Sequence, residues 1–225
     1  METNAALDVT ALHDKPTRTN EVYEQIIDIL IRGELRPGDV IVERRMAERL
    51  NASRTPVREA LGRLEAERMV LRQPGRGVTV APFSTEAFVE VLNIRQLLES
   101  EAARLAAGQI PPETISEIRD AMKALSEKSE PTPAEVWETD NLLHGAIAEA
   151  SGNELMAAMI RDLRRRTHVF NAFRNPNKHI YQYDENAKLL DAIETGDGET
   201  ARAAMTQHIE TVKVAIVSRL AGLTR

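Results

Sequence analysis

The stretch that decides the fold is residues 51–80, NASRTPVREALGRLEAERMVLRQPGRGVTV. Its first half carries apolar residues at the i, i+3, i+4 and i+7 spacing of one buried helical face, namely Val57, Ala60, Leu61 and Leu64. Its second half places two short apolar runs, 69–73 and 78–80, around the turn sequence PGRG, in which glycine permits a tight turn. The stretch therefore predicts a helix followed by a slim-tipped β-hairpin.

The start of this helix carries further signals. Ser53 or Thr55 can cap the first turn by accepting an orphan backbone N–H, and Pro56 suits a turn in which its missing N–H has no partner to lose. Upstream, apolar residues at 41, 46, 47 and 50 mark a shorter helix, and residues 51–52 form the turn between the two. Two helices joined by so short a turn and followed by a hairpin predict a winged helix-turn-helix.

Arginine is concentrated in this region. Residues 44–76 hold nine arginines and four glutamates, whereas the whole chain has a net charge of −6. Arg54 and Arg58 are four residues apart, so they share one face of the helix. A basic patch on an acidic protein localises attraction to phosphates, as DNA binding requires. The alternative, a solvated arginine-rich helix and hairpin, is disfavoured because turn, cap, helix and wing agree with one another.

Composition limits what the rest of the chain can be. A chain of 225 residues with 42% hydrophobic and 4% aromatic content can hold two modest domains packed from helices. The absence of cysteine excludes disulfides and metal–thiolate chemistry. No apolar run approaches the ~20 residues of a membrane span, and residues 1–20 lack a signal-peptide core. We therefore expect a cytoplasmic protein with a flexible tail at 1–20, a DNA-binding domain at 21–83 and a helical domain at 84–225.

The pattern after residue 84 is helical throughout. Proline and glycine separate six amphipathic segments, which we place near 85–107, 112–129, 134–150, 154–174, 177–195 and 199–221. Six amphipathic helices with short links predict an antiparallel bundle. The expected fold is thus mainly α: an N-terminal winged helix-turn-helix with a small β-hairpin wing, and a C-terminal antiparallel bundle of about six helices.

Polar side chains interrupt the apolar stripes of three bundle segments. Asp140 and His144 share one stripe, while Asn186 and His208 interrupt two others. Buried charge and buried imidazole are costly unless they are paired or coordinated, so these groups predict one shared polar centre. Neutral imidazole with carboxylate suits Zn²⁺, Ni²⁺ or Mn²⁺. The spacing alone leaves open a core in which Asp140 and His144 simply hydrogen-bond each other.

The N-terminal region resembles the GntR family of bacterial transcription regulators. The resemblance rests on SRTPVREAL, with ERRMAERL before it and RLEAERMV and PGRG after it, over about residues 22–82. It implies arginine contacts to operator DNA and a wing tip in the minor groove, so the candidate DNA-binding residues are Arg44, Ser53, Arg54, Thr55, Pro56, Arg58, Gly75 and Arg76. The family usually has glycine where this chain has Arg68, so we expect a changed turn before the wing.

The C-terminal region resembles the FCD ligand-binding domain of the FadR subfamily, over roughly residues 84–221 and on motifs that include DNLLH and MTQH. Many such domains hold a divalent metal through one Asp and three His, and a small carboxylate effector completes the shell. The resemblance implies Asp140, His144 and His208 as ligands, with Asn186 where the middle histidine is expected. An amide oxygen is a weaker ligand than imidazole for these metals. The ion is therefore bound more weakly, completed by water, or absent.

Arginines are the candidates for binding the effector. Arg95 lies on the inward side of the first bundle segment, where it either pairs with Glu99 or clamps an effector carboxylate. The resemblance favours the clamp, with Asn186 as the second effector contact. Arginines 161, 164, 165 and 166 span most of a helix circumference, so we expect a solvated or interface surface from which Arg161 or Arg165 could reach the pocket.

These features together predict a transcription regulator whose operator affinity responds to a small carboxylate metabolite. We expect a homodimer on double-stranded operator DNA, because one helix-turn-helix reads a half-site and two-fold symmetry matches a near-palindromic operator. One alternative is an enzyme whose metal, held by Asp140, His144 and His208, activates water. The sequence offers no general base or nucleophile beside that cluster. The other alternative is a regulator that responds to metal alone.

Overall fold

The computed structural model describes residues 17–82, 84–174 and 183–220. Contacts divide the chain into two units, one of Met1–Asp28 with Gly38–Ala81 and one of Ile29–Pro37 with Pro82–Arg225. This division falls after residue 81, whereas the sequence placed the boundary after 83. The expected N-terminal tail at 1–20 lies mostly outside the described residues, but its last three residues already belong to a helix.

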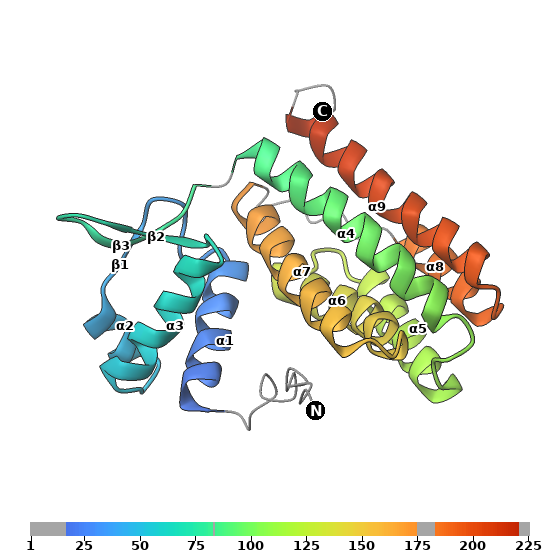
Figure 1. Ribbon diagram of the computed structural model, residues 1–225, viewed down its shortest axis with the longest axis horizontal. Coiled ribbons are helices and arrows are strands. Elements are labelled where there is room, and N and C mark those ends of the chain that lie inside the picture. The colour runs from blue at the N-terminus through green and yellow to red at the C-terminus, as the bar shows by residue number, and fades with distance from the viewer. Residues whose placement is uncertain (1–16, 83, 175–182, 221–225) are drawn as a thin grey trace, which may run out of the picture. The chain divides into compact units, whose positions relative to one another are not determined.

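The first unit is a winged helix-turn-helix, as the sequence predicts (Figure 1). Its helices are α1 (Arg18–Ile31), α2 (Glu43–Arg49) and α3 (Arg54–Ala66). Strands β2 (Val70–Gln73) and β3 (Gly77–Val80) form the wing hairpin, and the short strand β1 (Val40–Ile41) pairs with the other edge of β3. The result is an antiparallel sheet of strand order β1-β3-β2.

The apolar face of α3 is buried as its spacing predicts. Val57, Ala60, Leu61 and Leu64 each have no exposed surface. The predicted cap is wrong, however: Ser53 occupies the N-cap position but its side chain accepts no hydrogen bond, and Thr55 lies inside the helix. Both side chains are exposed. Their hydroxyls therefore point to solvent at the edge of the surface that was predicted to meet DNA.

The turn between α3 and the wing is made by a left-handed residue that is not glycine. Arg68 has φ 59°, its N–H donates to the carbonyl of Glu65 at 3.0 Å, and the next N–H donates to the carbonyl of Leu64 at 2.9 Å. This closes α3 in the way that glycine usually does. The expectation of a changed turn is wrong, because Arg68 adopts the backbone conformation that glycine favours and keeps its side chain exposed.

The second unit is the predicted helical bundle. Six helices lie in its described part: α4 (Thr85–Ala106), α5 (Pro112–Ser126), α6 (Pro133–Ala150), α7 (Glu154–Arg174), α8 (Tyr183–Glu194) and α9 (Gly198–Leu220). Residues 127–129, predicted to extend α5, lie outside the helix, and the predicted start of α8 near 177 falls outside the described residues. None of the helices in the described ranges combines the length and apolar character needed to cross a membrane.

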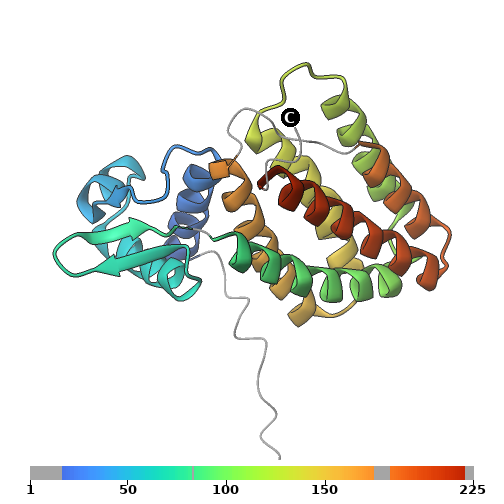
Figure 2. The same ribbon diagram turned by 90° about the horizontal axis from the view of Figure 1, so that it is seen from above.

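Helix α4 organises the bundle. It packs against α6, α7 and α9, and Figures 1 and 2 show it running between α9 and α7. Ser84 caps its first turn by accepting the N–H of Ala87 at 3.1 Å, and Phe88 stacks on Phe170 of α7 with ring centroids 3.9 Å apart. Because α4 is packed against several helices, polar residues on its inner face are buried, and these include Arg95 and Glu99.

Candidate functional site

The candidate DNA surface is built on α2, α3 and the wing. The side chains of Arg44, Arg54 and Arg58 are 72%, 63% and 62% exposed, so all three are accessible to a DNA duplex. Pro56 differs from the other predicted contacts because it is buried under the first turn of α3. It therefore supports the helix start from inside and does not face a ligand.

The tip of the wing keeps the slim shape that its glycines predict. Gly75 and Gly77 have φ of 77° and 78°, and the N–H of Arg76 donates to the carbonyl of Gln73 at 3.1 Å. A Cβ added at either glycine would meet no atom within 4 Å, so backbone conformation, not space, requires glycine here. Arg76 is exposed between them, where a groove-binding side chain is expected.

The bundle encloses a polar centre, and Glu99 is its first carboxylate. In the sequence, Glu99 appeared only as a possible partner of Arg95. Glu99 is 1% exposed; its Oε1 accepts from Nε of Arg95 at 2.6 Å and its Oε2 is 2.5 Å from Nδ1 of His144. Nη1 of Arg164 lies 3.7 Å from the same Oε2. Burial alone would raise the pKa of Glu99, but Arg95, His144 and Arg164 outweigh it and hold the pKa far below its usual range. Glu99 is therefore a buried carboxylate ion.

The second carboxylate of the centre is Asp140. Its Oδ2 accepts from Nη2 of Arg164 at 2.9 Å and lies 3.0 Å from Nε2 of His168. Burial would raise the pKa of Asp140, but the charge of Arg164 and the hydrogen bond from His168 hold it well below its usual range. Asp140 is thus ionised and already paired on one oxygen. Its Oδ1 lies 3.7 Å from Nε2 of His144.

The histidines of the centre are neutral. Burial lowers the pKa of His144, and Arg164 lowers it further. Burial lowers the pKa of His208 to about 3. With an ionised carboxylate beside it, Nδ1 of His144 is the protonated nitrogen, so Nε2 offers a lone pair. The two imidazole rings are close, with centroids 5.1 Å apart. The predicted cluster of His144 and His208 is therefore present on adjoining helices.

Several buried atoms in this centre have no hydrogen-bond partner among the described residues. They include Nε2 of His144, Oδ1 of Asn186 and Nδ1 of His208, three of the four predicted metal ligands. Asn186 is 2% exposed on α8, and in the described part of the bundle no hydrogen bond joins it to the two histidines. Buried polar atoms in native proteins are nearly always partnered, so these atoms could bind a group that the described residues do not supply.

The donor set fits a divalent ion in part. A histidine that gives its Nδ1 proton to a carboxylate and keeps Nε2 free is the usual form of a metal-bound histidine, and Oδ1 of Asp140 faces that nitrogen. Within the described ranges, however, no three His, Asp or Glu side chains are placed to hold one ion. An ion bound here would need the amide oxygen of Asn186 or water to complete its shell.

The arginines of α7 are not all solvated: Arg161 is 39% exposed, but the predicted solvated or interface surface is wrong for Arg164 and Arg165. Arg164 and Arg165 are 1% and 7% exposed, and Arg164 reaches both carboxylates of the centre. Its Nε and Nη1 have no hydrogen-bond partner in the described structure. The signal that could have found Arg164 is spacing: it follows Ala157 and Ile160 on the apolar stripe of α7, at i+7 and i+4.

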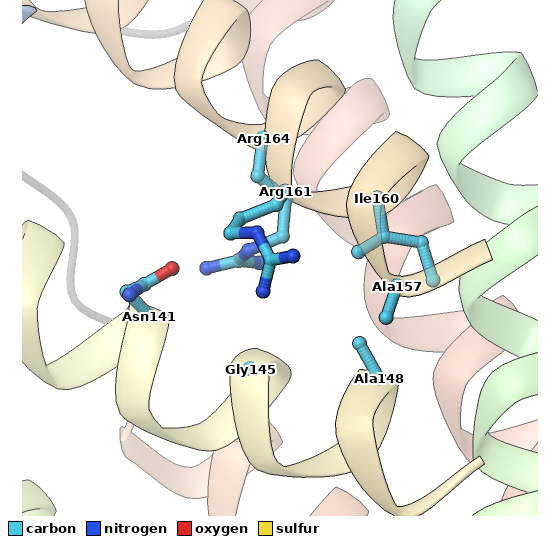
Figure 3. A pocket seen from close by; sticks show the side chains of 7 residues that line it. All are labelled: Asn141, Gly145, Ala148, Ala157, Ile160, Arg161 and Arg164. Atoms are coloured by element: carbon cyan, nitrogen blue, oxygen red, sulfur yellow. The ribbon is translucent and has the colours of Figure 1, made fainter. Parts of the chain in front are cut away.

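A small, partly open hollow lies between α6 and α7. It is lined by Asn141, Gly145, Ala148, Ala157, Ile160, Arg161 and Arg164. Figure 3 shows the guanidinium groups of Arg161 and Arg164 pointing toward Asn141 across the space that these small side chains leave. Because Arg164 also contacts Asp140, it connects the hollow with the polar centre.

The structure shows the ion pair that one interpretation of Arg95 predicts, whereas the effector clamp stays a prediction. Its Nε donates to Glu99, as the ion-pair interpretation predicts, and the side chain is 5% exposed. Within the described residues its terminal nitrogens donate no hydrogen bond, so the outer edge of the guanidinium is available. Arg95 can therefore hold Glu99 and a ligand carboxylate together.

A winged helix-turn-helix with exposed arginines, joined in one chain to a bundle with a buried polar centre, defines a DNA-binding regulator that carries a ligand-binding domain. Residues 18–80 match the bacterial regulatory proteins of the gntR family, and residues 90–211 match the FCD domain. The chain belongs to the GntR family of bacterial transcription regulators and carries an FCD domain in its C-terminal part.

Relatives agree with this assignment along nearly their whole length. The chain is 30% identical over 205 residues to the HTH-type transcriptional regulator LutR of Bacillus subtilis, covering 80% of this chain and 93% of LutR. It is 32% identical over 216 residues to the Uxu operon transcriptional regulator of Escherichia coli, covering 86% and 84%. The solved structure of E. coli McbR/YncC superposes with a TM-score of 0.76 at 25% identity, covering 91% and 99%. The protein is a DNA-binding transcription regulator and not an enzyme.

Proposed function

We propose that the FCD domain binds a small organic acid in the polar centre and that its occupancy controls operator affinity. The observation that carries this proposal is the set of unpartnered buried atoms around Glu99 and Asp140. Among the described residues, Nε and Nη1 of Arg164 lack acceptors, and Nε2 of His144 and Oδ1 of Asn186 carry lone pairs without donors. Arg95 donates from Nε to Glu99. A carboxylate would satisfy the guanidinium groups by charge-assisted hydrogen bonds.

The chemistry of the acid follows from the remaining acceptors. Oδ1 of Asp140 and Nε2 of His144 lie 3.7 Å apart, and two lone pairs at that distance need a donor or a cation between them. A hydroxyl group on the acid would supply the donor. The best-fitting effector is therefore a small carboxylate, and one with a neighbouring hydroxyl satisfies both halves of the site.

A weakly bound divalent ion is the second part of the proposal. Its ligands would be Asp140, His144, Asn186 and His208, with water completing the shell, and the candidates remain Zn²⁺, Ni²⁺ and Mn²⁺. When bound, the ion supplies positive charge next to the effector carboxylate. The free lone pair of His144 supports this proposal, while the pairing of Asp140 with Arg164 and His168 limits the strength of binding.

We also propose that the protein acts as a homodimer through α4 and α7. Ile94 and Leu97 of α4 are 45% and 70% exposed, and Leu155 and Met159 of α7 are 56% and 45% exposed. Each pair spans one helical turn, and Phe88 stacked on Phe170 shows that the two helices are neighbours. Exposed apolar residues gathered on two adjacent helices fit an isologous contact with a second copy.

The proposal also covers the subfamily of the protein, its DNA partner and its location in the cell. We assign the chain to the FadR subfamily because the FCD domain and the DNLLH motif occur together in it. Its partner is double-stranded operator DNA, so we place the protein in the cytoplasm. The two winged helix-turn-helix domains of one dimer would bind a near-palindromic site.

The test combines ligand binding with DNA binding in one protein. Trp137, the only tryptophan of the chain, lies beside His168 with ring centroids 4.2 Å apart, so its fluorescence reports on the centre. Mono-, di- and hydroxycarboxylates are titrated into the protein with and without Zn²⁺. Operator affinity is measured on a DNA site selected from random sequences. We expect at least one acid to change fluorescence, melting temperature and operator affinity, and Arg95→Ala to abolish all three responses. A series of acids that changes none of them contradicts the proposal.

A further inference from the structure

One carboxylate lies among the arginines of the candidate DNA surface. Glu43 begins α2 with its side chain 20% exposed. Its Oε2 is 3.7 Å from Nη2 of Arg54 and 3.5 Å from Nε of Arg58, both on α3. Its Oε1 is 4.0 Å from Nη1 of Arg72, on the wing strand β2. One carboxylate of α2 is thus within 4.0 Å of arginines on both α3 and the wing.

We propose that Glu43 is a specificity-determining residue of the DNA interface, which positions Arg54 and Arg58 and suppresses sequence-independent binding. The proposal rests on the DNA-binding function established by the family. It concerns an acidic residue, whereas the candidate contacts on this surface are basic or neutral.

The positioning part follows from the freedom of exposed arginines. Arg54 and Arg58 have more than half of their side-chain surface in solvent, and an untethered arginine there occupies many rotamers. Glu43 favours those rotamers of both arginines that keep the guanidinium groups near the start of α3. Binding to bases then requires less additional ordering, and pre-organisation of this kind favours the one DNA sequence that fits the fixed arrangement.

The suppression part follows from charge. Phosphate attraction supplies essentially all sequence-independent binding, and a carboxylate among the arginines weakens it. The pairs at 3.5–4.0 Å are looser than close hydrogen bonds, so DNA can displace them. A bidentate contact between arginine and a guanine edge compensates for the lost pair. Phosphate contacts alone compensate less, so Glu43 lowers non-specific affinity more than operator affinity.

The experiment compares two variants with the same charge change. Glu43→Gln removes the carboxylate that faces the arginines. Glu59→Gln is the matched control on α3, because the Glu59 carboxylate accepts from Oγ1 of Thr19 at 2.6 Å and pairs with no arginine in the described part of the chain. Affinity is measured for the selected operator and for a scrambled duplex of the same length, each over a range of salt concentrations.

We expect Glu43→Gln to strengthen binding to the scrambled duplex by roughly threefold to tenfold and to steepen its salt dependence. Operator affinity should rise less or fall, so the ratio of the two affinities drops, while Glu59→Gln leaves that ratio unchanged. An equal rise for both duplexes, or the same drop in both variants, overturns the proposal.

A second variant keeps the proposal testable if Glu43→Gln does not fold. Glu43→Asp retains the charge but shortens the side chain, so it should keep the salt dependence and still lose part of the specificity ratio. An unchanged ratio in this variant overturns the positioning part. Wild-type protein that prefers no DNA sequence over the scrambled duplex would instead count against the function on which the inference rests.

Discussion

Nη2 of Arg164 on α7 donates to Oδ2 of Asp140 on α6 at 2.9 Å, and it also donates to the backbone carbonyl of Asp140 at 2.9 Å. The arginine therefore fixes both the side chain and the helix of its partner. It lies 3.7 Å from Glu99 as well, so its guanidinium is shared between Asp140 and a carboxylate that Arg95 also binds. The stability of the bundle and the charge of its centre depend on the same side chain.

Replacing Arg164 should strongly destabilise the protein. Arg164→Met leaves Glu99 and Asp140 buried with less compensation, and breaking a buried ion pair costs about 3–5 kcal/mol. The control is Arg161→Met, because Arg161 is partly exposed and lies 3.8 Å from Glu149, so its loss should cost about 0.5 kcal/mol or less. Urea unfolding measures both. Equal effects would mean that the contacts of Arg164 contribute little.

A histidine at position 186 should strengthen metal binding. Asn186→His supplies the imidazole that the family resemblance leads us to expect, and we predict an increase of roughly tenfold or more in Zn²⁺ affinity because imidazole is the better ligand. Competition with a chromophoric chelator measures this. Asn141→His, in the hollow between α6 and α7, is the control and should change affinity little. The same affinity in Asn186→His and wild type would place residue 186 outside the ion's reach.

Stability should fall as the pH is lowered through the range of the buried histidines. Burial lowers the pKa of His168 to about 4 and that of His208 to about 3, from 6.5. At a pH between the folded pKa of each histidine and 6.5, the unfolded chain binds a proton that the folded protein does not. The free energy of unfolding therefore rises with pH in this range. Each group contributes up to about 1.4 kcal/mol per pH unit, and the loss is incurred as the pH falls from 6.5 toward 3.

The measurement is urea unfolding at a series of pH values, with a chelator present so that metal binding does not contribute. Removing one histidine should reduce the slope, and His208→Gln is the suitable variant because its Nδ1 has no hydrogen-bond partner to lose among the described residues. A slope that is unchanged in this variant would show that His208 titrates normally in the folded protein.

The sequence predicts those parts of the protein that depend on local pattern. The α3 stripe, the wing glycines and the six bundle helices follow from periodicity and turn residues, and the structure confirms them. The polar interruptions at Asp140, His144 and His208 are confirmed as buried or nearly buried neighbours. These features are predictable because each is encoded within a few turns of one helix.

The features that the sequence did not predict depend on which helices pack against one another. Glu99 looks like half of an ordinary i, i+4 pair with Arg95, and only packing brings His144 and Arg164 to it. Arg164 lies in a run of arginines that resembles a solvated surface, yet Asp140 on another helix makes its burial possible. In the same way Glu43 belongs to the DNA surface only because α2, α3 and the wing converge on it.

The proposed dimer predicts that a charge on the α4–α7 face disrupts assembly. Leu97→Glu introduces a charge at a side chain that is 70% exposed, so the fold of one copy should be unaffected. We expect sedimentation to show monomer and operator affinity to fall at least tenfold, because one head reads only a half-site. Val214→Glu on α9, at a residue 54% exposed, is the control. A dimeric Leu97→Glu protein would rule out this face.

The left-handed residue before the wing gives the last prediction. Arg68 adopts φ 59°, a conformation that costs an L-residue about 1–2 kcal/mol relative to glycine. Glycine loses more chain entropy on folding, so Arg68→Gly should stabilise the protein by a net amount of about 0.5–1 kcal/mol. Asn51→Gly, at φ 47° in the helix-turn-helix turn, should gain less because asparagine tolerates this conformation.

Urea unfolding measures both variants, and DNA binding separates strain from function. If Arg68 serves only the turn, the stabilised variant binds the operator as wild type does. If its exposed guanidinium contacts a phosphate, Arg68→Gly is more stable but binds more weakly, with a salt slope reduced by about one. Loss of stability in Arg68→Gly would mean that the strain relieved at Arg68 is smaller than the extra chain entropy that glycine loses on folding.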